Sequence, residues 1–354
     1  MTSDARLERF VERMPKVELH VHLEGTIQPA TLLKLAERRR VHLPADDVEG
    51  LRQWFRFRDS EHFVHIFLTC SKCLRDPEDF QLVAREFLAE QSRQNVLYSE
   101  VHFTIGSHLA NGVDGDEVAD ALDEVRREGE RAGGVRMRWI PDIVRNVGPA
   151  RADRTLEWAL DGRRKGVVAL GLSGFESEPN EPFREHFQVA AAEGLHRVAH
   201  AGEHGGPDSI RSVLEIFDAE RIGHGIRAAD DPALVEELAG RGIPLEVCPS
   251  SNVRLGVVAE LARHPFDRLW RSGVAVTVNS DDPTFFDTTL TQEYLALSRA
   301  FGYGAPQLAT LSLTALEHAF LDRPERSAFE EEFRRQFADL GAELLGDPVT
   351  PAGV

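Results

Sequence analysis

The amino-acid sequence predicts a (β/α)₈ barrel, also called a TIM barrel, and three observations support this fold class. Short β-rich apolar runs alternate with longer segments of helical periodicity, which is typical of parallel strands joined by crossover helices. We count eight such runs, which is the number of strands in this barrel. The 354 residues suit one barrel with insertions, so we expect a single domain over residues 1–354.

The expected strands are short apolar runs spread over the first four fifths of the chain. In order, they are Val17–His22, Leu97–Phe103, Arg136–Pro141, Val167–Ser173, Arg197–Ala201, Arg221–Gly225, Pro244–Pro249 and Val274–Asn279.

Amphipathic segments between these runs predict the outer helices, and several end in a glycine that suits the position after a helix C-terminus. The clearest are Gly115–Gly133, Pro182–Gly194, Pro232–Gly242 and Val257–Gly273. Thr31–Asn95 is too long for one crossover helix, so we expect extra helices inserted after the first strand, one of them around Arg75–Gln91. Past Phe286 the sequence stays helical to about Leu345.

Charge and composition exclude several classes of function. The formal net charge is −18, from 59 acidic and 41 basic residues, so the protein would repel nucleic acids and anionic membranes. We find no run of about 18 apolar residues and no signal-like N-terminus, and therefore expect a cytoplasmic protein without a membrane partner. Three cysteines do not form a disulfide framework, which favours a reducing compartment. A homo-oligomer is compatible with the sequence.

Histidines and aspartates fall at the carboxyl ends of the expected strands. His20 and His22 end the first strand, His200 ends the fifth, and Asp281 and Asp282 follow the eighth. Residues two apart on a strand share one side, and active sites of these barrels lie at the C-terminal face. Three imidazoles and one of the two carboxylates therefore predict a catalytic zinc site that keeps an open position for water.

Two further residues at this face have side chains suited to proton transfer. Glu203 lies three residues after His200, and His224 ends the sixth strand. Taken alone, Glu203 could equally be a solvated loop residue, and His224 could equally be a core histidine whose hydrogen bonds are satisfied. Their placement beside the expected metal ligands favours a proton donor in Glu203, whose pKa we expect partial burial to raise.

Five segments together resemble the adenosine deaminase family. They are Pro15-Lys16-Val17-Glu18-Leu19-His20-Val21-His22-Leu23-Glu24-Gly25, His200-Ala201-Gly202-Glu203, Arg221-Ile222-Gly223-His224-Gly225, Leu245-Glu246-Val247-Cys248-Pro249-Ser250-Ser251 and Asn279-Ser280-Asp281-Asp282-Pro283. The resemblance implies a zinc-dependent aminohydrolase that converts a 6-aminopurine into the 6-oxopurine and releases ammonia.

The resemblance also implies a role for each matched residue. His20, His22, His200 and Asp281 would bind one Zn²⁺ per chain. Glu203 would protonate N1 of the purine, and His224 would orient or deprotonate the attacking water. Asp282 would contact N7, and the backbone at Gly174 would contact N3.

One residue departs from the pattern of the adenosine-specific members. They carry an aspartate that reaches the ribose 5′-hydroxyl, where this chain has Glu24, and a carboxylate displaced by about an ångström loses that hydrogen bond. Three substrates stay open: adenosine, free adenine, and a nucleoside altered at its 5′ end such as 6-aminodeoxyfutalosine. The segment Val101–His108 is unlike the adenine-specific members and favours something larger than adenine, whereas Asn279–Phe286 resembles the adenine type.

Three alternatives are less compatible with the sequence. His22, Glu24, Cys70 and Cys73 partly match the zinc motif of cytidine-type deaminases, but Thr69 replaces its proline and the cysteines suit the core of a helix over Phe63–Leu74. A non-catalytic purine or zinc binder would need neither Glu203 nor His224. A two-metal hydrolase would place a lysine on the fourth strand, and none occurs there.

Overall fold

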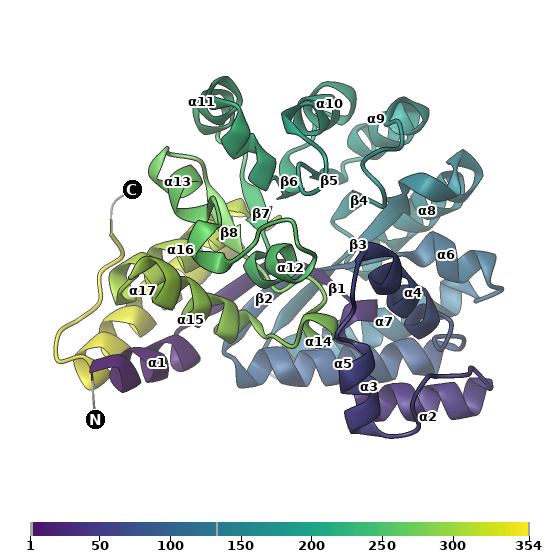
Figure 1. Ribbon diagram of the computed structural model, residues 1–354, viewed down its shortest axis with the longest axis horizontal. Helices are drawn as coiled ribbons and strands as arrows, with labels where there is room; N and C mark the ends of the chain where they lie inside the picture. Colours follow the sequence, from purple (N-terminus) through teal and green to yellow (C-terminus); the bar gives the residue numbers. More distant parts are fainter. Residues whose placement is uncertain (1–2, 132–133, 353–354) are drawn as a thin grey trace.

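The computed structural model, which describes residues 3–131 and 134–352, confirms the barrel. Within these residues, eight parallel strands follow one another in chain order, and helices surround them (Figure 1). The strands are β1 (Lys16–His22), β2 (Val96–Phe103), β3 (Arg136–Val144), β4 (Ala169–Ser173), β5 (His196–Ala201), β6 (Arg221–His224), β7 (Leu245–Val247) and β8 (Val276–Val278). Each overlaps one predicted strand, and β7 and β8 are shorter than predicted.

The barrel closes between β8 and β1 through residues of the predicted metal site. The backbone N–H of His22 donates to the carbonyl of Asp281 at 2.8 Å, and the N–H of Asp281 donates to the carbonyl of His20 at 3.1 Å. Ring closure therefore places three of the predicted ligands at one level of the barrel.

Extra helices fill the segment between β1 and β2, as predicted. They are α2 (Pro29–Arg39), α3 (Val48–Trp54), α4 (Ser60–Ser71) and α5 (Pro77–Arg93), and the 3₁₀ turn η1 (Glu24–Thr26) connects them to β1. Both α4 and α14 (Pro283–Phe286) contact η1. The insertion therefore covers the carboxyl end of β1, where the predicted site begins.

Shorter helices and turns make up the rest of the outer ring. They are α6 (Ile105–Ala110), α7 (Gly115–Arg131), η2 (Arg145–Val147), α8 (Pro149–Asp161), η3 (Gly162–Lys165), η4 (Glu181–Phe183), α9 (Arg184–Ala192), α10 (Pro207–Phe217), η5 (Ile226–Asp230), α11 (Pro232–Arg241) and α12 (Pro249–Arg254). The predicted helices that begin at Gly115, Pro182 and Pro232 are confirmed, although Gly133, the predicted end of the first, lies outside the described residues.

The single helix predicted over Val257–Gly273 is wrong. This segment forms only the turn η6 (Leu261–Arg263) and the short helix α13 (Phe266–Arg271). Pro265 has no N–H to donate and favours an extended residue before it, and His264 has φ −62° and ψ 136°. The break turns His264 inward, where it is buried.

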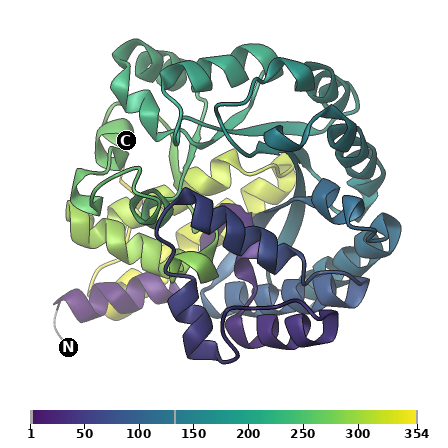
Figure 2. The same cartoon turned by 45° about the vertical axis from the view of Figure 1, so that its right-hand side comes forward.

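The C-terminal helices complete the barrel wall. They are α15 (Leu290–Phe301), α16 (Ala305–His318) and α17 (Arg323–Leu344). α16 packs against β8 and β1 and so covers the closure, while α1 (Ser3–Arg13) lies beside α15 and α17 (Figure 2). The prediction of helices past Phe286 is confirmed.

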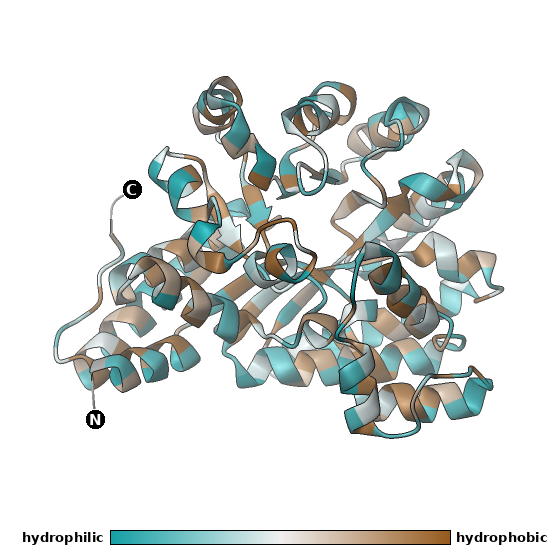
Figure 3. Cartoon of the chain, in the orientation of Figure 1, coloured by the Kyte–Doolittle hydropathy of each residue, from teal (hydrophilic) through white to brown (hydrophobic). Residues whose placement is uncertain are grey.

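One continuous hydrophobic core holds the helices against the barrel. Hydrophobic and hydrophilic segments alternate along the surrounding helices (Figure 3), as expected for amphipathic elements. Cys70 and Cys73 are buried in this core, in agreement with the packing role predicted for them. None of the described helices combines the length and apolar character that a bilayer crossing requires.

Candidate active site

The side chains of His20, His22, His200 and Asp281 meet inside the carboxyl end of the barrel. The Nε2 atoms of His22 and His200 are 3.2 Å apart, and Oδ1 of Asp281 lies 3.4 Å from His22 Nε2 and 3.8 Å from His20 Nε2. Four ligand atoms bound to one zinc ion at 2.0–2.1 Å would form a tetrahedron with edges of about 3.3 Å. These three distances, three of the six edges of such a tetrahedron, are close enough to that value for the four predicted ligands to hold one ion.

Hydrogen bonds at the other ring nitrogens leave two of these histidines able to bind a metal through Nε2. His20 Nδ1 donates to Glu246 Oε2, and His200 Nδ1 donates to the carbonyl of Leu172, both at 2.8 Å. A neutral imidazole has one N–H, so each Nε2 is left with a free lone pair. Burial and the neighbouring imidazoles lower the pKa values of His20, His22 and His200 well below the ordinary value, which keeps the rings neutral.

Asp142, near the end of β3, supplies a carboxylate behind His22. Its Oδ1 accepts from His102 Nδ1 at 2.9 Å, and its buried Oδ2 has no partner and lies 3.8 Å from His22 Nδ1. Gly171 on β4 leaves room for this carboxylate, because a Cβ there would lie 1.8 Å from Asp142 Oδ1. Asp142 is therefore positioned to accept the Nδ1–H of His22 when Nε2 binds a metal.

A buried ion-pair network holds Glu246 in place below the cluster. Arg221 on β6 donates through Nε to Glu246 Oε1 at 2.6 Å, and it also pairs with Glu100 on β2. All three side chains are buried, and breaking such a pair leaves an uncompensated charge. The network therefore keeps the Glu246 carboxylate facing His20.

Glu203 lies in the loop after β5, between the metal cluster and solvent. Its Oε1 lies 3.7 Å from His224 Nδ1, and its Oε2 lies 3.2 Å from His204 Nδ1. Burial raises the pKa of Glu203, but His224, His204 and His200 outweigh it and lower the pKa to about 2. Burial therefore acts in the predicted direction, but the neighbouring imidazoles reverse the net shift.

Glu176, in the loop after β4, anchors the loop that carries Glu203. Its carboxylate accepts the backbone N–H groups of residues 202–205 and the hydroxyl of Ser209. These bonds lower its pKa against the effect of burial. One ionised side chain therefore fixes the backbone position of Glu203.

A series of hydrogen bonds sets the tautomer of His224. The N–H of Phe266 donates to His264 Nδ1 at 3.1 Å, His264 Nε2 donates to Asn252 Oδ1 at 3.1 Å, and Asn252 Nδ2 donates to His224 Nδ1 at 3.2 Å. Because Nδ1 of His224 accepts, its proton is on Nε2, which lies 3.8 Å from Asp281 Oδ2. His224 therefore presents an N–H to the centre of the site.

Two site residues have left-handed backbone conformations. His224 has φ 60° and Asp281 has φ 64°. Such angles cost non-glycine residues about 1–3 kcal/mol and cluster at functional sites. Each lies at the carboxyl end of its strand or just beyond it, where the side chain turns into the barrel mouth.

Asp282 lies beside Gly25 and Glu24, which begin the insertion after β1. A Cβ at Gly25 would lie 2.0 Å from Asp282 Oδ1, and this buried oxygen has no partner among the described residues. Burial raises the pKa of Asp282 well above its ordinary value, and Asp281, Glu24 and Glu203 add to the effect. Asp282 is therefore suited to remain a neutral acid that donates a hydrogen bond.

Glu24 is clamped by the segment that follows β2. Its Oε1 accepts from the backbone N–H of Thr104 at 2.9 Å, from the Thr104 hydroxyl at 2.8 Å and from His108 Nε2 at 3.0 Å. Burial raises the pKa of Glu24, but these bonds and the charge of His108 outweigh it and lower the pKa below the ordinary value. Its other oxygen, Oε2, is buried and unpartnered.

Gly174 follows β4 on the same face of the barrel. Its φ is 88°, and its carbonyl accepts from the buried Arg145 at 3.3 Å. The structure therefore brings Gly174, like the other predicted site residues, to the carboxyl end of the barrel.

Sequence reasoning missed the residues that support the site. Glu246 could have been identified from the sequence, because a carboxylate inside an apolar strand requires a buried partner. No local pattern marked Asp142, Asn252 or Glu176, whose partners are distant in sequence, and His204 was overlooked although its partner Glu203 is the preceding residue.

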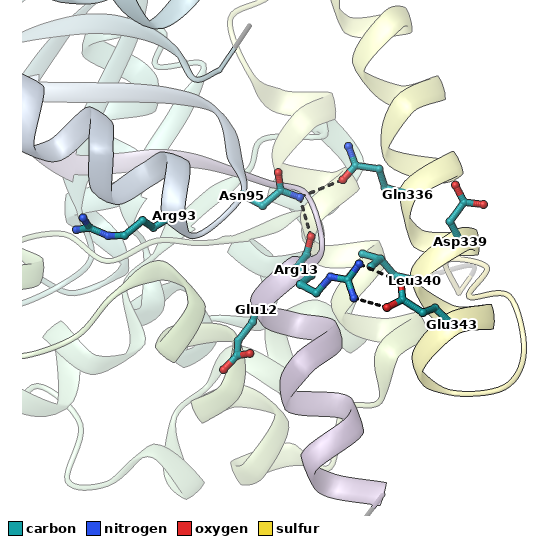
Figure 4. Close-up of a pocket in the computed structure, with 8 residues that line it drawn as sticks. All are labelled: Glu12, Arg13, Arg93, Asn95, Gln336, Asp339, Leu340 and Glu343. Carbon is teal, nitrogen blue, oxygen red and sulfur yellow. Dashed lines mark hydrogen bonds and ion pairs between the residues drawn. The ribbon is translucent and has the colours of Figure 1, made fainter. Parts of the chain in front are cut away.

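A surface cavity of about 420 Å³ lies away from this site (Figure 4). Asn95, just before β2, donates to the carbonyl of Arg13 and to Gln336, and Arg13 pairs with Glu343. These residues lie at the amino ends of β1 and β2, the face of the barrel associated with stability. Their polar groups are satisfied by one another, so the cavity carries no chemistry.

Comparisons with known proteins agree with this geometry. A family model described as adenosine deaminase matches residues 15–336. The aminodeoxyfutalosine deaminase of Streptomyces coelicolor is 39% identical over 92% of this chain and 85% of its own, and the adenine deaminase of Cupriavidus necator is 38% identical over 94% and 95%. An amidohydrolase of Burkholderia ambifaria, solved with bound zinc, has a TM-score of 0.89 and 26% identity, over 98% of this chain and 96% of its own.

Proposed function

This chain belongs to the adenosine deaminase family and is a hydrolytic deaminase of adenine-type substrates, and from this premise we propose that its substrate is a 6-aminopurine nucleoside altered at the 5′ end. The reaction replaces the 6-amino group by oxygen and releases ammonia. 6-Aminodeoxyfutalosine is one substrate of this kind.

Zn²⁺ is the metal that the four-residue cluster supports best. His20, His22, His200 and Asp281 offer three nitrogens and one oxygen at tetrahedral spacing, and the buried His20 Nε2 has no other partner. A zinc ion held there would act as a Lewis acid and lower the pKa of the attacking water to about 7.

The remaining residues handle protons around the purine. Glu203 passes a proton to N1, which withdraws electrons from C6 as water attacks. His224 orients that water by donating from Nε2, because Asn252 occupies its Nδ1. Asp282, whose pKa is raised by burial and by neighbouring carboxylates, donates to N7.

The observation that carries the choice of substrate is the clamp on Glu24. Its Oε1 already has three donors from Thr104 and His108, so the carboxylate is held toward the β2 loop. Only Oε2 is free to accept from a substrate, and its direction is fixed. A carboxylate held in this way is poorly placed to accept a hydrogen bond from a mobile ribose 5′-hydroxyl. This favours a nucleoside that the protein recognises through its other groups.

Free adenine is the second candidate, and one observation favours it. Glu24 Oε2 and Asp282 Oδ1 are both buried and unpartnered, beside the same turn η1. Adenine without ribose offers N7 as an acceptor and N9–H as a donor in its five-membered ring, separated by C8. Asp282 and Glu24 would satisfy this pair.

A substrate panel tests the proposal directly. We expect zinc-loaded enzyme to release ammonia from 6-aminodeoxyfutalosine with a higher kcat/KM than from adenosine, 2′-deoxyadenosine, methylthioadenosine or adenine. A higher kcat/KM for adenine would support the second candidate. No ammonia from any of the five would contradict a 6-aminopurine substrate.

Glu24→Asp tests the role of the clamp. The shorter side chain should release Thr104 and His108 and raise the kcat/KM for adenosine relative to the 5′-altered nucleoside. Glu78→Asp, the same change at an exposed position in the first turn of α5, is the matched control and should leave the ratio unchanged. An unchanged ratio in Glu24→Asp would mean that the 5′ end is recognised elsewhere.

A further inference from the structure

Among the residues that the structure describes, His204 is the partly exposed side chain in contact with the Glu203 carboxylate. Its side chain is 48% exposed, whereas that of Glu203 is 13% exposed, and Nδ1 of His204 lies 3.2 Å from Glu203 Oε2. On its other side Glu203 Oε1 faces His224 Nδ1 at 3.7 Å. The three side chains form a row from solvent to the interior of the site.

We propose that His204 is the proton donor to Glu203 and connects the active site to solvent. This inference rests on the proposed role of Glu203 in protonating the purine. The Nδ1–H bond of His204 breaks as an O–H bond forms at Glu203 Oε2. That O–H bond then breaks as the proton passes to N1, and the neutral imidazole recovers a proton from water.

The ionisation of Glu203 explains why such a donor is needed. The neighbouring imidazoles lower the pKa of Glu203 to about 2, so its carboxyl group is ionised at neutral pH. The proton for N1 must therefore come from another group at the moment of reaction. An imidazolium in hydrogen-bond contact supplies it, and solvent can recharge it because the ring is half exposed.

The charged groups around His204 favour its protonated form. Glu203 raises its pKa by accepting the Nδ1–H bond, burial opposes this, and Glu176 adds a smaller rise. Arg227, in η5, is the cation that lowers the pKa. Together they hold the pKa of His204 above its ordinary value, which favours the protonated ring.

The backbone holds His204 where this transfer can occur. Its N–H donates to Glu176 Oε1 at 2.8 Å, and the N–H of Glu203 donates to the same oxygen at 2.9 Å. Glu176 therefore fixes donor and acceptor together.

His204→Gln tests the proposal, because glutamine can keep a hydrogen bond to Glu203 but does not titrate. With the best substrate of the panel, wild-type kcat/KM should fall as pH rises through the pKa of His204. The variant should lose this alkaline fall, and its kcat at neutral pH should be at least about 10-fold lower. Added imidazole buffer should raise the rate of the His204→Ala variant but not that of the wild type. His42→Gln, an exposed histidine of the loop after α2, is the matched control.

A measurement without turnover supports the same conclusion. In NMR titrations of the zinc-loaded protein, the His204 signal should titrate above the ordinary value in the wild type and closer to it in Glu203→Gln. Equal His204 pKa values in the two proteins would overturn the proposal, and so would a His204→Gln enzyme within twofold of wild type across the pH range. If the glutamine variant does not fold, His204→Asn and this titration take its place. Absence of turnover by the wild type would instead contradict the proposed function.

Discussion

Gly171→Ala should weaken metal binding although Gly171 touches no ligand. The added Cβ would lie 1.8 Å from Asp142 Oδ1, and an ordinary contact needs about 3.4 Å. The carboxylate must therefore move by about 1.6 Å, which the hydrogen bond to His102 does not tolerate and which displaces Oδ2 from its place 3.8 Å from His22 Nδ1. Losing a carboxylate that accepts a hydrogen bond from a metal-bound histidine typically reduces metal affinity by about 10–100-fold, or about 1.4–2.8 kcal/mol.

The assay is a Zn²⁺ titration of the metal-free protein against a competing chelator. Gly240→Ala, in α11, is the matched control, because a Cβ there meets no atom within 4 Å and alanine favours the helix. Asp142→Ala should lower the affinity to a similar degree. Adding Gly171→Ala to Asp142→Ala should then lower the zinc affinity only slightly further, because the carboxylate that would clash with the new Cβ has been removed.

Two results would refute this reasoning. Unchanged zinc affinity in Gly171→Ala would mean that the carboxylate moves without consequence. Additive losses in the double variant would mean that the alanine acts through the backbone of β4 and not through Asp142.

Three other predictions concern the site and its support. Glu203→Gln should keep its zinc yet lose most deamination, because an amide cannot pass a proton to N1; full kcat in ammonia-release assays would contradict this role. Asp281→Ala should lower both bound zinc, measured by metal analysis, and rate; one tightly held zinc would argue against Asp281 as a ligand. Burial lowers the pKa of His264 to about 4 in the folded protein. Between pH 4 and 6.5, His264 therefore binds more protons in the unfolded state than in the folded state. The free energy of unfolding should therefore fall as pH falls through this window, by at most about 3 kcal/mol, and less steeply in His264→Gln. Urea unfolding at several pH values checks this, and equal slopes in the two proteins would exclude His264 as the cause.

Much of the fold could be predicted because its signals are local. Runs such as Val167–Leu172 contain only apolar residues and glycine, as expected of a parallel strand that is buried on both faces. The long segment Thr31–Asn95 indicated the inserted helices by length alone. The predicted helix over Val257–Gly273 failed because one proline outweighed an amphipathic pattern.

The part of the candidate site that lies at the ends of strands could be predicted from the sequence. His20, His22, His200 and Asp281 could be grouped because parallel strands bring their carboxyl ends to one face. The direction in which the pKa of Glu203 shifts could not be predicted from the sequence. It depends on the imidazoles of His224, from β6, and of His204, from its own loop, which lie within a few ångströms of the carboxylate only in the folded protein.

The sequence by itself determined the barrel, the face on which chemistry occurs and the residue types of the metal cluster, because each follows from periodicity and position along a strand. Only the tertiary structure decided which groups support them. Asp142 serves His22 because Gly171, on the next strand, leaves space for its carboxylate. Glu24 turns toward Thr104 and His108, and His224 presents Nε2–H, because partners far along the chain fix their hydrogen bonds. Such partners are set by three-dimensional distance, which no local pattern encodes.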